Sequence, residues 1–118
     1  MLFFIFFSCE TENVSKIEAS EFKVKIENSD VQLLDVRTRK EFDEGHISNA
    51  ILIDVKGDYF LSKSEEKLIK GKPIYIYCKS GVRSKKATRI LQANGFTKIY
   101  NLEGGILNWQ AKKYKINK

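Results

Sequence analysis

The segment from Cys78 to Ser84, which reads Cys-Lys-Ser-Gly-Val-Arg-Ser, holds the residue types best suited to chemistry in this chain. It follows an apolar run at residues 74–77 and precedes a basic segment at residues 85–91 that is compatible with a helix. The thiol is therefore expected at the end of a buried strand, on a short loop that opens a helix. Such a loop can hold a sulfur anion and present it to a small anionic substrate.

The reactive form of a cysteine is its thiolate, so Cys78 needs surroundings that favour negative charge on sulfur. A helix N-terminus contributes about 0.3–1 kcal/mol, and up to about 2 kcal/mol when partly buried. Each backbone N–H donated to a charged sulfur adds about 1.5–3 kcal/mol. Lys79 and Arg83 add positive charge, and Gly81 allows successive N–H groups to point at one centre. We therefore expect an activated thiol; the alternative is a buried, inert cysteine at a strand end.

Three sequence signatures in register resemble the rhodanese-like (single-domain sulfurtransferase) family. The first lies within residues 34–51 and contains Leu-Asp-Val-Arg, Glu-Phe, Gly-His-Ile and Asn-Ala-Ile. The second is the loop that begins at Cys78, and the third is Leu-Glu-Gly-Gly-Ile-Leu-Asn-Trp at residues 102–109. Their order and spacing cover the chain from about Val14 to Lys113.

In that family the loop cysteine attacks the outer sulfur of a donor such as thiosulfate, becomes a persulfide and passes the sulfur to a thiophilic acceptor. The resemblance therefore implies that Cys78 is the nucleophile and the persulfide carrier. It also implies that Lys79 and Arg83 attract the charged end of the donor. The residues expected to line the donor pocket all belong to the loop: Lys79, Ser80, Gly81, Val82 and Arg83.

Asp35 and Arg37 match a pair that lies at the end of a neighbouring strand in the family, and we expect them to support the site rather than to react. Arg37 and Glu41 are spaced i, i+4, so they could pair on one helix face. The single histidine, His46, is expected to make a structural hydrogen bond at a turn. With one histidine and two distant cysteines, no metal cluster is expected, and the resemblance implies no cofactor.

Loop length separates two activities on this kind of fold. Four residues lie between Cys78 and Arg83, as in the sulfurtransferase pocket, which is sized for one extra sulfur. Cysteine-dependent phosphatases use a loop one residue longer, which encloses a tetrahedral phosphate. A phosphatase or arsenate reductase is thus the weaker alternative. A non-enzymatic interaction module is another, although family members of that kind typically lack the loop cysteine.

Composition indicates one soluble globular domain of 118 residues, with 42% hydrophobic and 31% charged residues. The net charge is +6. Lys85, Lys86 and Arg89 could steer anions toward Cys78, or they could form a solvated helix face. No aromatic-rich basic patch is present, so nucleic acid is not expected as a partner. The expected partners are a small anionic sulfur donor and a thiophilic acceptor, bound by a monomer.

The first nine residues, Met-Leu-Phe-Phe-Ile-Phe-Phe-Ser-Cys, differ from the rest of the chain. The apolar run is too short to span a bilayer. It resembles the end of a bacterial lipoprotein signal peptide, although it lacks a basic start and has Phe6 where a small aliphatic residue is usual. We expect residues 1–9 to be such a segment, Cys9 to carry lipid, and residues 14–118 to form a domain in the cell envelope or periplasm. The alternatives are a short strand, a disordered tail and a cytoplasmic protein.

Alternating apolar and polar segments predict a single α/β domain, a parallel central sheet with helices on both faces. Strands are expected at residues 14–17, 31–36, 50–55, 74–77 and 98–101. Helices are expected at residues 20–28, 39–44, 82–93 and 105–112, with a helical or irregular connection at 58–69. Ser20 is expected to cap the first helix. Ligands of such folds bind at the carboxyl ends of strands, where Asp35 and Cys78 both fall.

Overall fold

A computed structural model describes residues 14–118 of the chain, so the expected lipid attachment at Cys9 lies outside the described residues. One parallel sheet of five strands has the order β1-β5-β4-β2-β3. The strands are β1 (Ser15–Ile17), β2 (Gln32–Asp35), β3 (Ile51–Leu52), β4 (Ile74–Tyr77) and β5 (Ile99–Leu102). The helices are α1 (Ala19–Asn28), α2 (Arg39–Glu44), α3 (Phe60–Lys67), α4 (Val82–Ala93) and α5 (Gly105–Ala111). Within residues 14–118 no helix is long and apolar enough to cross a membrane.

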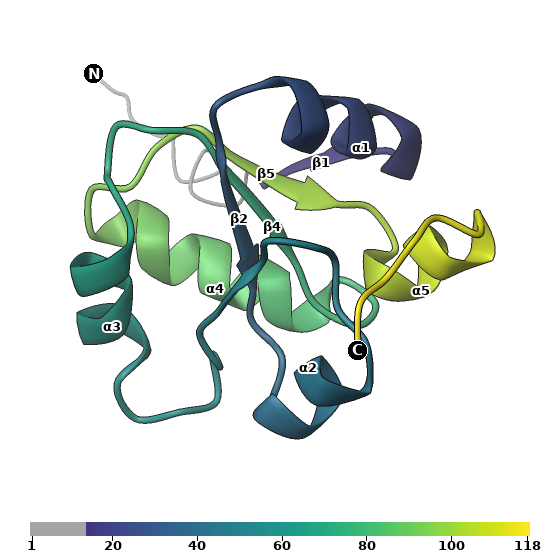
Figure 1. The fold of residues 1–118 in the computed structure, drawn as a ribbon. Coiled ribbons are helices and arrows are strands. Elements are labelled where there is room, and N and C mark those ends of the chain that lie inside the picture. Colours follow the sequence, from purple (N-terminus) through teal and green to yellow (C-terminus); the bar gives the residue numbers. More distant parts are fainter. Residues whose placement is uncertain (1–13) are drawn as a thin grey trace, which may run out of the picture.

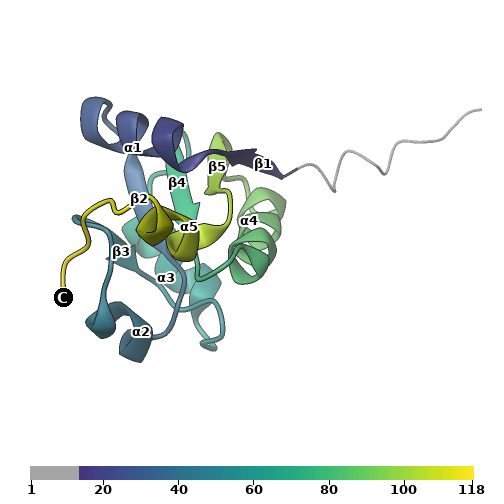
Figure 2. The same cartoon turned by 90° about the vertical axis from the view of Figure 1, so that its right-hand side faces the viewer.

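Helices cover both faces of the sheet, as Figures 1 and 2 show from two sides. Side chains of α1 and α5 pack on one face, where Phe22 and Trp109 meet edge to face at 6.4 Å between ring centroids. Side chains of α3 and α4 pack on the other face. Strands β2 and β4 are buried at every position, which explains their nearly continuous apolar sequences. The predicted fold class is therefore confirmed.

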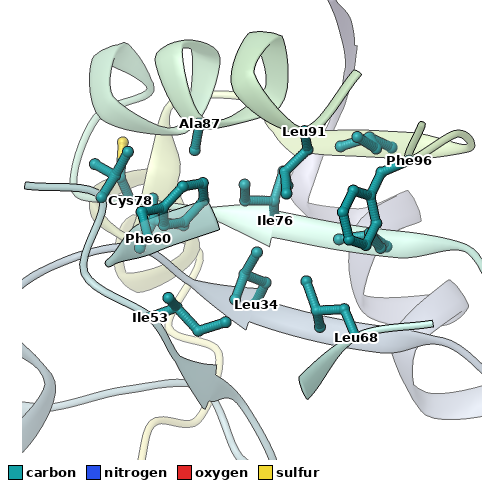
Figure 3. Packing of buried hydrophobic residues seen from close by; sticks show 13 residues of the cluster. Leu34, Ile53, Phe60, Leu68, Ile76, Cys78, Ala87, Leu91 and Phe96 are labelled. Atoms are coloured by element: carbon teal, nitrogen blue, oxygen red, sulfur yellow. The ribbon is translucent and has the colours of Figure 1, made fainter. Parts of the chain in front are cut away.

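The core beneath α4 ends at the cysteine of the loop. Alternate residues of β4 point to this face, because successive side chains of a strand lie on opposite sides of the sheet. Ile76 packs there with Leu34 of β2 and with Ala87 and Leu91 of α4. Figure 3 shows Cys78 at one end of this cluster, with its sulfur at the end of the side chain nearest α4. The packing of the core thus fixes where the thiol lies.

Two local predictions were wrong. The strand expected at residues 50–55 is regular only over Ile51–Leu52, where it pairs with β2 at the sheet edge. Its continuation still binds the end of β2, since the Ile53 N–H donates to the Asp35 carbonyl at 3.0 Å. Ser20 does not cap α1, which begins at Ala19 and has Glu18 at the N-cap without a side-chain hydrogen bond.

Candidate active site

The ends of two adjacent strands bring the candidate residues together. Asp35, the last residue of β2, pairs in register with Tyr77, the last residue of β4. Cys78 follows Tyr77 directly and is 1% exposed. As expected for a parallel sheet, Asp35 and Cys78 lie at the same, carboxyl edge of the strands.

The loop after β4 folds back over the sulfur of Cys78. The backbone N–H of Gly81 donates to Cys78 Sγ at 3.0 Å. Gly81 has a φ of 120°, a conformation that residues with a Cβ rarely adopt. Its N–H group, at the start of α4, favours negative charge on the sulfur because it is a hydrogen-bond donor next to the positive end of the helix dipole. Of the successive N–H groups expected to point at the sulfur, the Gly81 N–H is the one that does so among the described residues.

Ser84 is a second group at the sulfur, and the sequence analysis gave it no role. Its Oγ lies 3.5 Å from Cys78 Sγ and donates to the Gly81 carbonyl at 3.2 Å. A hydroxyl can rotate to donate to a thiolate or to accept from a thiol. The signal was present in the sequence, because Ser84 lies in the first turn of a helix that begins at the loop.

The first turn of α5 supports the loop from the other direction. The Ile106 N–H donates to the Cys78 carbonyl at 2.9 Å, and the Leu107 N–H donates to the Lys79 carbonyl at 3.1 Å. Gly105 makes this approach feasible, since a Cβ at that position would lie 2.7 Å from the Cys78 carbonyl oxygen and would overlap the Lys79 carbonyl. The third sequence signature therefore holds the second in place.

Arg83 is engaged by a carboxylate. Its Nη1 and Nη2 atoms donate to Glu41 Oε1 and Oε2 at 2.7 and 2.8 Å. The i, i+4 pair suggested for Arg37 and Glu41 does not form, because α2 begins at Arg39 and Arg37 lies outside the helix, bound to Asp35. The guanidinium of Arg83 is thus already bound to a carboxylate. Its expected role, attraction of the sulfur donor, stays a prediction.

Glu41 links the loop to the start of α2. Its Oε1 also accepts from the Thr38 backbone N–H at 3.1 Å, and the Thr38 hydroxyl accepts from the Glu41 N–H at 3.2 Å, which completes a capping box. The Arg83 hydrogen bonds, with those of Thr38, hold the pKa of Glu41 well below its usual range despite its partial burial. The same bonds from Glu41 raise the pKa of Arg83. Both side chains therefore stay charged and joined.

Asp35 and Arg37 form a second, buried pair. Arg37 Nη2 donates to Asp35 Oδ2 at 2.7 Å and to the Gly45 carbonyl at 2.7 Å. Burial opposes the charge of Arg37, but the hydrogen bonds and the charge of Asp35 outweigh it and raise the pKa of Arg37. These contacts tie the end of β2 to the turn after α2. They agree with a supporting role for both residues.

His46 makes structural contacts in the same turn. Its Nδ1 lies 2.8 Å from the Phe42 carbonyl oxygen, and its ring stacks on Phe42 with 3.7 Å between centroids. The His46 backbone also exchanges hydrogen bonds with Asn117. The prediction of a hydrogen-bonding residue at a turn agrees with this geometry. Among residues 14–118, no group of three His, Cys, Asp or Glu side chains could hold a metal ion.

Two cavities flank the loop, one on each side. The smaller, about 190 Å³, lies on the α2 side, and its lining includes Arg37, Glu41, Lys79 and Leu107. The larger, about 770 Å³, lies on the α4 side. Its lining includes the loop residues Ser80, Gly81 and Val82 together with Lys16, Lys85 and Lys86. The loop that carries the thiol thus contributes lining residues to two cavities of different size.

Comparison with known proteins matches this arrangement. Residues 18–112 fit the family model described as Rhodanese-like domain. The chain is 42% identical over 81 residues to uncharacterized protein YqhL of Bacillus subtilis (strain 168), covering 69% of this chain and 62% of that protein. It is 36% identical over 95 residues to the tRNA uridine(34) hydroxylase of Cytophaga hutchinsonii, covering 79% of this chain and 30% of that protein. The chain therefore spans less than two thirds of either relative.

A solved structure has the same fold. It is the solution structure of the rhodanese-like domain of the Alr3790 protein from Anabaena sp., which superposes with a TM-score of 0.79 at 25% sequence identity. The match covers 86% of this chain and 77% of the Anabaena chain. The fold of this chain is therefore shared with a known domain over most of its length.

Proposed function

The chain belongs to the rhodanese-like domain family, and we propose that it is a sulfurtransferase that carries a sulfane sulfur as a persulfide on Cys78. The observation that carries this proposal is the position of the sulfur. Cys78 Sγ accepts the Gly81 N–H at 3.0 Å, inside a loop with four residues between Cys78 and Arg83. A thiolate stabilised by a backbone N–H needs no further base to attack a sulfur donor.

The proposed reaction with a thiosulfate-like donor has two steps. The Cys78 thiolate attacks the outer sulfur of thiosulfate, the donor S–S bond breaks, and sulfite leaves with the bonding electrons. The enzyme then holds a persulfide, Cys78–S–S⁻. In the second step a nucleophilic acceptor attacks the outer sulfur, the enzyme S–S bond breaks, and the Cys78 thiolate is restored. Cyanide as acceptor leaves as thiocyanate, so charge and sulfur balance in both steps.

The charges around the loop favour Lys79 as the residue that attracts the donor. Arg83 and Arg37 are each bound to a carboxylate, whereas Lys79 is exposed and lines the smaller cavity. We propose that the Lys79 ammonium attracts the anionic end of the donor and that Arg83 fixes the end of the loop through Glu41. Ser84 Oγ, 3.5 Å from the sulfur, can donate to the thiolate that leaves in the second step.

The alternatives fit the site less well. A phosphatase or arsenate reductase would need room for a tetrahedral oxyanion, and the loop of four residues folds tightly enough for Gly81 N–H to contact the sulfur. A non-enzymatic interaction module would not require a buried thiol that contacts Gly81 and Ser84. The hydroxylation named for the Cytophaga hutchinsonii relative is not transferred to this chain, which spans 30% of that protein.

The direct experiment is a cyanolysis assay on purified protein. With thiosulfate and cyanide, wild-type protein should release thiocyanate, and Cys78→Ser should reduce the rate to that of buffer. Measuring far-ultraviolet circular dichroism of both proteins shows that the variant is folded. Wild-type activity equal to that of Cys78→Ser would refute the proposal.

A further inference from the structure

The cavity on the α4 side of the loop is not the one beside Lys79, where we propose that the donor binds. It lies between α4 and the strands β1 and β5, and it borders the loop at Ser80, Gly81 and Val82. We propose that this hollow, here called the acceptor cavity, binds the sulfur acceptor, and that the acceptor is a small thiol whose carbon arm carries carboxylates and a net negative charge. This inference rests on the proposed sulfur transfer and adds to it the acceptor's class and position.

Charge is the first argument for an anionic ligand. Lys16 of β1 and Lys85 and Lys86 of α4 line the acceptor cavity. These lysines are exposed, and none forms a salt bridge with a carboxylate of residues 14–118. Arg89 adds another cation, and Glu103 is the carboxylate among the lining residues. An excess of cations in a concave site raises the local concentration of anions.

Size and apolar lining argue for a ligand with a carbon arm. The acceptor cavity holds about 770 Å³, which is within the usual range of about 300–1,000 Å³ for sites of small organic ligands. Its wall also contains Val14, Val82 and Ile90, and Val82 is 77% exposed. A compact inorganic donor would leave most of this space unfilled, whereas a thiol on a carbon arm would cover the exposed valine.

The acceptor cavity lies next to the reacting sulfur. Its lining residues Gly81 and Ser84 are also the two that contact Cys78 Sγ, at 3.0 and 3.5 Å. A thiolate bound in the acceptor cavity would therefore approach Cys78 from the α4 side of the loop. It attacks the outer sulfur of the Cys78 persulfide, the enzyme S–S bond breaks, and Cys78 leaves as a thiolate. The acceptor departs as R–S–S⁻, so the negative charges balance.

The test compares two thiols on sulfur-loaded enzyme. Glutathione is anionic and carries amide hydrogens, whereas 2-mercaptoethanol is neutral. The variant Lys16→Gln/Lys85→Gln/Lys86→Gln should lower the second-order rate of sulfur transfer to glutathione by about tenfold and change the rate with 2-mercaptoethanol by less than about twofold. Added salt should reduce the wild-type rate with glutathione and should leave the rate with 2-mercaptoethanol unchanged.

A matched control separates local charge from net charge. Lys25→Gln/Lys63→Gln/Lys67→Gln removes the same charge from exposed lysines that line neither cavity, and it should keep the wild-type preference for glutathione. The proposal would be overturned if the cavity variant lost sulfur-transfer rate equally with both thiols. It would also be overturned if both triple variants lost the rate with glutathione equally.

Failure of this inference can be told apart from failure of the proposed function. Wild-type protein that takes up no sulfur from thiosulfate would refute the sulfurtransferase proposal itself. Binding of S-methylglutathione, which cannot react, tests the cavity without sulfur transfer. Its amide chemical-shift changes should map to Lys85, Ile90 and Asn101 in wild type and weaken in the cavity variant. Shifts elsewhere, or none, would overturn the cavity as the acceptor site.

Discussion

The two sides of the active-site loop carry positive charge in opposite ways. On the α2 side, Arg37 and Arg83 are each bound to a carboxylate, with shortest N–O distances of 2.7 Å in both pairs. On the α4 side, Lys85 and Lys86 have no salt bridge within residues 14–118. Paired charges hold the backbone in place, whereas unpaired charges can meet a ligand. We infer that the paired arginines of the α2 side build the loop and that the unpaired lysines of the α4 side bind the sulfur acceptor.

The largest effect on stability is expected from the buried pair of the α2 side. Asp35→Asn leaves Arg37 without its counter-charge in a place where Asp35 is 0% and Arg37 5% exposed. Removing one partner of a buried pair costs about 3–5 kcal/mol, so the free energy of unfolding in urea should fall by about 3 kcal/mol. Asp43→Asn, which breaks the exposed pair with Arg39, should cost less than about 1 kcal/mol. Similar losses of unfolding free energy in both variants would show that the buried ion pair stabilises the fold no more than an exposed one.

A smaller but functionally sharper effect is expected at Gly105, which supports the loop between the two sides. Gly105→Ala adds a Cβ that would overlap the Lys79 carbonyl and places it on a residue with a φ of 63°. Overpacking and the left-handed conformation together should cost about 2–3 kcal/mol. The displaced loop should also lower sulfur-transfer activity in protein that is still folded.

Gly71→Ala is the matched control for Gly105→Ala, because nothing lies within 4 Å of a Cβ at Gly71. It should leave both stability and activity near wild type. Full activity of folded Gly105→Ala would show that α5 does not position the loop.

The Glu41–Arg83 pair should make the free energy of unfolding depend on pH. Because the pKa of Glu41 is lower in the folded protein than its ordinary value of about 4.5, the pair stabilises the fold above that value. Its contribution shrinks as the pH falls below about 4.5 toward the folded pKa, since the unfolded chain then binds the proton first. Glu41→Gln should thus lose about 1 kcal/mol at pH 7 and progressively less under acid.

Unfolding curves of wild type and Glu41→Gln at pH 7, 5 and below 4 would measure this difference. Glu66→Gln, an exposed glutamate on α3, should show no such convergence with wild type. A gap between wild type and Glu41→Gln that is constant with pH would contradict the assignment.

The smallest effect on stability is expected on the α4 side. Lys16→Gln/Lys85→Gln/Lys86→Gln removes exposed charges that form no salt bridge within residues 14–118, so its free energy of unfolding should stay within about 0.5 kcal/mol of wild type. Thermal unfolding measures this directly. A loss as large as that of Asp35→Asn would mean that these lysines build the fold and would remove the contrast between the two sides.

Patterns local in sequence predicted the frame of the site. The apolar run of β4 and the periodicity of α4 gave the bounds Ile74–Tyr77 and Val82–Ala93 as the structure has them. Because parallel strands end at one edge, Asp35 and Cys78 could be placed together without coordinates. These features follow from neighbours in the chain, and the hydrophobic core enforces them.

Pairings between distant segments could not be predicted in the same way. The Thr38-x-x-Glu41 spacing signals a capping box, but nothing near Glu41 in sequence points to Arg83, 42 positions away. The i, i+4 rule misassigned Arg37 because that rule holds only inside a helix. Likewise, Lys85 and Lys86 could be read as a solvated face, since the residue that completes the acceptor cavity, Lys16, comes from the far edge strand.

The central claim, that Cys78 carries sulfur, is tested most directly by intact mass spectrometry after incubation with thiosulfate. The wild-type protein should gain about 32 Da for each sulfur bound, with fragmentation placing the added mass on Cys78 and with cyanide removing it. Cys78→Ser should gain nothing. A wild-type mass that does not change, or an added sulfur that persists in Cys78→Ser, would contradict the account.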